Sequence, residues 1–145
     1  MKKIDIDRHA TAQINMLANK LMLKSSHAYT QKFGIGMMEW RVISVLFSNL
    51  NSSVQSISDI LGLDKAAISR TIKKLQEKEY ITVINNSEDK RQYIIDLTNS
   101  GRSLYGIASD FAKERERELL SDLDENQKNE LFNLLKILRH KVDEM

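Results

Sequence analysis

The chain has 145 residues, of which 41% are hydrophobic and 29% are charged, and its formal net charge at pH 7 is +2. This length and composition fit one globular domain spanning residues 1–145. The sequence has no cysteine, which excludes disulfides, thiolate metal sites and a thiol redox switch. No stretch approaches the ~18 consecutive apolar residues that a membrane span needs, and the N-terminus does not resemble a signal peptide, so we expect a cytoplasmic protein.

The absence of proline and the presence of only five glycines favour a mostly helical chain. The first predicted helix runs from about Arg8 to Lys32, and the glycines of residues 34–36 end it. It would span about 37 Å. This is long for a small domain and suggests a helix that packs on a partner chain. A second helix is predicted over about residues 37–48, with an apolar stripe.

A short helix is expected to start at Ser56, because Asp59 follows three residues later in the capping-box arrangement. Gly62 stands where a left-handed helix end is favoured. Asp64 is a suitable cap for the next helix, over about residues 65–78. Its apolar residues, expected to face inward, are Ile68, Ile72 and Leu75.

Two segments rich in β-branched residues follow, Ile81–Ile84 and Tyr93–Leu97, with a polar hairpin tip between them. Thr98 is expected to cap another long helix that continues through Leu119. Asp124 and Gln127 repeat the capping-box spacing before a final helix with a leucine stripe. The fold class is therefore mostly α with a small β-hairpin wing.

The two helices joined at Gly62 form a helix-turn-helix pattern, in which the second helix enters the major groove of DNA. Residues 65–78 carry five basic side chains against one acidic side chain, although the whole chain is nearly neutral. Arg70 or Lys65 can read guanine edges, small alanines can approach thymine methyls, and neighbouring lysines can meet phosphates. The residues that we place toward DNA here are Ser56, Lys65, Ala66, Ala67, Ser69, Arg70, Lys73 and Lys74.

The hairpin tip supports the same interpretation, because it carries Asp89, Lys90 and Arg91. Arg91 is suited to the narrow, electronegative minor groove. Asp89 can hold the guanidinium of Arg91 through a bidentate pair. We therefore assign all three residues to DNA binding.

The order and spacing of these segments resemble the MarR family of winged helix-turn-helix transcriptional regulators. The resemblance is carried by residues 40–43, 56–65, 68–78, 89–91 and 97–102, of which the Asp-x-Arg wing and the Leu-Thr-x-x-Gly segment are the distinctive parts. One departure is Glu79, at a position where the family commonly has glycine. Glu79 must either give a different helix exit or accept backbone strain.

The resemblance implies a homodimer, with dimerisation helices at residues 5–33 and 105–145 around a DNA-binding lobe at residues 37–98. Two recognition helices would then read a near-palindromic operator in double-stranded DNA, most simply as a repressor. The candidate interface residues are Leu17, Leu21, Leu131, Leu134, Leu138 and Val142.

The resemblance also implies release from DNA by a small aromatic or anionic effector. The candidate pocket residues are His27, Tyr29, Trp40, Arg41 and Phe111, although Trp40 and Phe111 fit a plain core role as well. We expect no cofactor and no metal site, because the three histidines are scattered and cysteine is absent.

Two other functions fit part of this pattern. A winged helix can serve protein interaction without specific DNA binding, but such a role would not require an exposed basic helix or Arg91. An enzyme is not expected, because no nucleophile–base order, phosphate loop or convincing carboxylate pair stands out.

Overall fold

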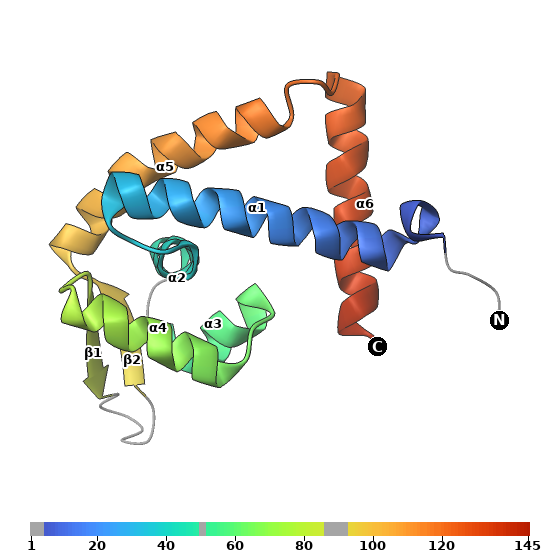
Figure 1. The fold of residues 1–145 in the computed structure, drawn as a ribbon. Coiled ribbons are helices and arrows are strands. Elements are labelled where there is room, and N and C mark those ends of the chain that lie inside the picture. The colour runs from blue at the N-terminus through green and yellow to red at the C-terminus, as the bar shows by residue number, and fades with distance from the viewer. Residues whose placement is uncertain (1–4, 50–51, 86–92) are drawn as a thin grey trace. The chain divides into compact units, whose positions relative to one another are not determined.

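The computed structural model describes residues 5–49, 52–85 and 93–145 (Figure 1). These residues form a short 3-10 turn, six α-helices and one antiparallel hairpin. The elements are η1 (Ile6–Arg8), α1 (Ala10–Phe33), α2 (Met37–Ser48), α3 (Val54–Leu61), α4 (Lys65–Glu77), β1 (Ile81–Asn85), β2 (Tyr93–Leu97), α5 (Asn99–Leu119) and α6 (Glu125–Asp143). The predicted fold class, mostly helical with a two-stranded wing, is confirmed. The chain divides into two compact units, residues 1–106 and 107–145.

The core of the first unit forms around α2, which contacts α1, α3, α4 and β2. Apolar side chains from α2, α3, α4, β1 and β2 meet there. The fully or nearly fully buried aliphatic residues are Val42, Ile43, Leu46, Ile57, Ile68, Leu75, Ile81, Ile95 and Leu97. Each such side chain contributes roughly 1.5–3 kcal/mol when it leaves water, so this core fixes α3 and α4 against α2.

Glycines end α1 and α3, as predicted. Gly34 has φ 67° and Gly62 has φ 63°, both in the left-handed region that side chains with a Cβ rarely adopt. The backbone N–H of Gly62 donates to the carbonyl of Ser58 at the end of α3. The chain can therefore turn directly from α3 toward α4.

The predicted start of α3 at Ser56 is wrong, because the helix begins at Val54 and Ser53 is its cap. Ser53 Oγ accepts from the N–H of Ser56 at 3.1 Å, and Ser56 Oγ accepts from the N–H of Ser53 at 2.9 Å. The carboxylate of Asp59 instead accepts from Gln55 Nε2 at 2.6 Å. Two serines at capping-box spacing thus replace the expected Ser56–Asp59 pair.

The hairpin pairs Ile81 of β1 with Leu97 of β2, and both side chains are buried on the core face. Ile95 is buried on the same face and also forms an isolated bridge with Ser52, whose carbonyl accepts from the N–H of Ile95 at 2.9 Å. The segment before α3 is therefore joined to β2 through the backbone.

The exit from α4 runs through Glu79, whose φ is 60°. The N–H of Tyr80 donates to Leu75 O, and the N–H of Glu79 donates to Gln76 O, both at 3.0 Å. These two bonds form the Schellman arrangement, which needs a left-handed residue at the position of Glu79. For this departure from the family pattern we predicted either a different helix exit or backbone strain, and the structure shows the strained backbone at Glu79.

The Leu-Thr-x-x-Gly segment, residues 97–101, is hydrogen-bonded to this exit. Thr98 Oγ1 donates to Glu79 O at 2.7 Å and accepts from the N–H of Gly101 at 3.0 Å, and the N–H of Thr98 donates to Tyr80 O at 3.0 Å. A Cβ on Gly101 would lie 2.1 Å from Tyr80 O. Glycine is therefore required here by the close approach of two backbones.

The second unit holds the later part of α5 and all of α6. Asp124 and Gln127 form the predicted capping box, because each side chain accepts from the other's backbone N–H at 2.9 Å. No residue of α6 is buried in the single chain. None of the helices in the described part of the chain combines the length and apolar composition that crossing a bilayer requires.

Candidate nucleic-acid interface

The turn between α3 and α4 is held at both ends by short polar contacts. Ser58 Oγ donates to the carbonyl of Leu63, and the N–H of Leu63 donates to the carbonyl of Ser58 at 3.1 Å. Asp64 caps α4 as predicted, because its Oδ1 accepts from the N–H of Ala67 at 2.9 Å. Ser58 was not singled out from the sequence, where it is one of several serines. These contacts fix the direction in which α4 leaves the turn.

One face of α4 is buried and the other is open. Ile68, Ile72 and Leu75 face the core as predicted, and Thr71 joins them, with its hydroxyl donating to Ala67 O at 2.9 Å. The opposite face holds six of the residues that we assign to DNA. Lys65, Ala66, Ser69, Arg70, Lys73 and Lys74 are exposed, and Ala67 is half-buried.

The positive charges of this open face lack nearby acidic partners. Among the residues that the structure describes, no carboxylate lies within ion-pair distance of Lys65, Arg70, Lys73 or Lys74. We call these four side chains the basic face of α4. An exposed row of cations along a helix, with no described carboxylate in ion-pair reach, is suited to a polyanion such as DNA.

Ser56 lies in the first turn of α3 and is half-buried. Its hydroxyl donates to Ser53 O at 3.0 Å and accepts from Ser53 N, so it is engaged within the helix start. The expected contact of Ser56 with a phosphate therefore stays a prediction.

The hairpin is described up to Asn85 and again from Tyr93. Asp89, Lys90 and Arg91 lie outside the described residues, so their assignment to DNA stays a prediction. At the base of the hairpin, Arg102 Nη2 lies 3.0 Å from Asp96 Oδ1. This ion pair joins β2 to α5 and was not expected from the sequence.

Two of the five predicted effector residues belong to a row of stacked rings in the first unit. Tyr29 and Trp40 are only 2% and 7% exposed, and their ring centroids are 5.4 Å apart. Trp40 also stacks on Tyr105 at 5.6 Å, and Tyr105 stacks on Phe47 at 3.7 Å. Tyr105 was not identified from the sequence. The rings contact one another directly, which supports the core role for Trp40.

The other three predicted effector residues differ in exposure. His27 is exposed on α1, and Arg41 is half-buried on α2. Phe111 is half-buried in the second unit, with the guanidinium carbon of Arg115 5.7 Å from its ring centroid. Their joint role as an effector site stays a prediction.

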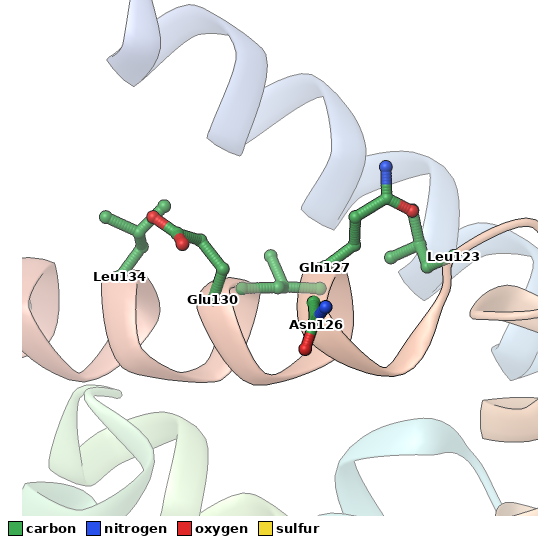
Figure 2. A pocket seen from close by; sticks show the side chains of 6 residues that line it. Leu123, Asn126, Gln127, Glu130 and Leu134 are labelled. Carbon is green, nitrogen blue, oxygen red and sulfur yellow. The ribbon is translucent and has the colours of Figure 1, made fainter.

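The predicted interface residues are mostly uncovered in the single chain. Leu17, Leu134, Leu138 and Val142 are exposed, and Leu21 and Leu131 are half-buried. A hollow of about 390 Å³ lies along the first half of α6 (Figure 2). Its lining consists of Leu123, Asn126, Gln127, Glu130, Leu131 and Leu134. Apolar side chains this open are unusual unless a further surface covers them.

Comparison with known proteins places this arrangement in a family. A sequence model of the MarR family matches residues 33–92. The chain is 70% identical to a MarR/EmrR family transcriptional regulator from Acinetobacter sp. ADP1, with a TM-score of 0.92 and coverage of 98% of this chain and 100% of that one. It is also 26% identical to the helix-turn-helix-type transcriptional regulator YwoH of Bacillus subtilis over 132 residues, which are 91% of this chain and 95% of YwoH.

More distant solved structures share the fold. The transcriptional regulator SlyA is 21% identical with a TM-score of 0.84, covering 93% of this chain and 94% of that one. MepR from S. aureus, solved as a complex with DNA, is 22% identical with a TM-score of 0.81, covering 91% of this chain and 98% of that one. Together with the predicted motifs and the near-complete match to the Acinetobacter regulator, these likenesses show that the chain belongs to the MarR family of DNA-binding transcriptional regulators.

Proposed function

We propose that the protein is a homodimeric transcriptional repressor that binds a near-palindromic operator through the basic face of α4. The observation that carries this proposal is the division of α4 into a buried apolar side and an open side. The open side has four cations and no described carboxylate in reach. A helix built in this way presents its first turns to the major groove.

The roles along α4 follow from geometry and side-chain chemistry. Lys65 and Arg70 stand at the exposed start and middle of the helix, where bidentate contacts to guanine discriminate by roughly 1–3 kcal/mol each. Lys73 and Lys74 lie further along and supply phosphate contacts, which add affinity but little specificity. Arg91 at the hairpin tip would enter the adjacent minor groove.

A homodimer is supported by the uncovered apolar residues of α6. Val142 is 66% exposed and Leu134 is 47% exposed, and a soluble chain rarely leaves such a stripe open. A two-fold axis would place two α4 helices in successive major grooves, about 34–36 Å apart. MepR, a fold relative, was solved bound to DNA.

We also propose that an aromatic or anionic effector releases the operator. PcaV from Streptomyces coelicolor, a fold relative, was solved in complex with its natural ligand. In this chain the candidate contacts are His27, Tyr29, Trp40, Arg41 and Phe111. Coupling of about 1–3 kcal/mol between effector and operator would be enough for regulation.

The proposal is tested by selecting duplexes from a random pool and then titrating the selected operator at several salt concentrations. Lys73→Ala should reduce the slope of log affinity against log salt by about 0.9, because one phosphate contact is lost. Lys24→Ala, an exposed lysine of α1, is the matched control and should leave the slope unchanged. A flat salt response of the unmodified protein, with no sequence enriched, would instead indicate a protein-interaction module.

A further inference from the structure

Lys78 follows α4 directly and adds to the basic character of residues 65–78, yet its charge is used inside the protein. Its Nζ lies 2.7 Å from Glu39 Oε1, in the first turn of α2, and donates to Gly34 O at 3.0 Å. Lys78 thereby connects the end of α4 to the end of α1 and the start of α2. All three elements belong to the first unit.

The environment of Glu39 makes this pair more than a surface contact. The Glu39 side chain is 9% exposed, whereas that of Lys78 is 38% exposed. Glu39 Oε2 accepts from the N–H of Gly36 at 2.6 Å, closing the cap of α2. Glu39 Oε1 is buried and accepts no hydrogen bond from the described residues, so its compensation among them is the charge of Lys78 alone. Loss of Lys78 would therefore leave a buried carboxylate oxygen without compensation, which is costly.

The carbonyl that Lys78 contacts adds a second attraction. Gly34 is the left-handed cap of α1, so its carbonyl lies at the negative end of a long helix dipole. One ammonium group is thus held by a buried carboxylate and by the C-terminal end of α1. This arrangement fixes the Nζ position from two directions.

We propose that the Glu39–Lys78 pair is a positioning device that sets the orientation of α4 for reading DNA, and that Lys78 does not itself contact phosphate. This inference rests on the proposed DNA-binding function. The start of α4 is fixed by the turn at Ser58 and Asp64, and Lys78 fixes its other end, roughly 20 Å away. A tilt at one end of such a helix displaces the residues at the other end relative to the bases.

The test compares variants of these two residues with one neighbouring lysine. Glu39→Gln keeps an oxygen that can cap α2 but removes the charge, and Lys78→Met keeps the apolar stem. Each should weaken operator binding about 3- to 30-fold without changing the salt slope. The double variant should bind the operator no more weakly than the single variant that has the lower affinity. Lys74→Met, the control, should reduce the slope by about 0.9, because Lys74 is expected to meet a phosphate.

The opposite pattern would overturn the proposal. If Lys78→Met reduced the slope as Lys74→Met does while Glu39→Gln had no effect, Lys78 would be a phosphate contact. Additive effects of the two single variants, or no effect on affinity, would also exclude a positioning role. Lys78→Arg, which keeps the charge, should recover part of the affinity lost in Lys78→Met.

Amide hydrogen exchange of the free protein gives a readout that needs no DNA. Glu39→Gln and Lys78→Met should both speed exchange at the N–H groups of residues 78–80, and Lys74→Met should not. If the unmodified protein bound no duplex, the proposed function would fail, whereas the exchange data would still decide whether the pair orders the end of α4. Unchanged amide exchange at residues 78–80 in both variants would refute the positioning role of the Glu39–Lys78 pair.

Discussion

Replacing Glu79 with glycine should stabilise the protein, although glycine usually does the reverse. Glu79 is the non-glycine residue with positive φ among those described, and its left-handed conformation costs an L-residue roughly 1–2 kcal/mol. Glycine removes this strain but loses more backbone entropy on folding, by about 0.5–1 kcal/mol. The balance predicts that Glu79→Gly raises the free energy of unfolding by up to about 1.5 kcal/mol. The bonds of this residue to Gln76 and Thr98 involve its backbone and would remain.

The matched control is the same substitution in an ordinary helix. Glu114 is exposed in α5, and Glu114→Gly should lower the free energy of unfolding by about 1 kcal/mol. Thermal unfolding at one fixed protein concentration measures both, because the proposed dimerisation would make Tm depend on concentration. We expect Tm shifts of opposite sign and of about 2–4 °C per kcal/mol. Equal destabilisation by both variants would refute the argument from backbone strain.

Three further predictions concern Gly101 beside the exit of α4, Arg91 of the wing, and the proposed dimer interface. Gly101→Ala should lower the free energy of unfolding by about 1–3 kcal/mol in chemical unfolding, because its Cβ would meet Tyr80 O. Gly106→Ala should instead raise it by up to about 1 kcal/mol, because a Cβ added at Gly106 has no neighbouring atom within 4 Å. Arg91→Ala should weaken operator binding in a titration while sedimentation still shows a dimer, and unchanged affinity would remove the wing from the interface. Leu138→Glu should shift the protein toward monomer in sedimentation equilibrium, since a charge would enter an apolar contact, and an unaltered dimer constant would place the interface elsewhere.

Local signals in the sequence predicted most of the secondary structure. The bounds of α2 were predicted as observed, and the ends of α1 and α3 followed from Gly34 and Gly62, because few other residues adopt a left-handed cap. The start of α3 was wrong because Ser53 and Ser56 both have a possible partner three residues later. Spacing alone cannot rank two such caps.

The candidate site was predictable where it depends on one helix and not where it depends on packing. The spacing of Ile68, Ile72 and Leu75 predicted which face of α4 is buried, and hence which face is open. The pair of Glu39 with Lys78 and the stacking of Tyr105 join residues far apart in the chain. Such contacts depend on the tertiary fold, so no periodicity in the sequence indicates them.

The backbone bridge between Ser52 and Ile95 has a mechanical consequence. It couples the entrance of α3 to the strand that leaves the wing, without passing through α4. A displacement of β2 would act through this hydrogen bond on the start of α3, the first helix of the helix-turn-helix. The described base of the hairpin and the start of α3 are thereby linked by a direct backbone hydrogen bond as well as by the shared core.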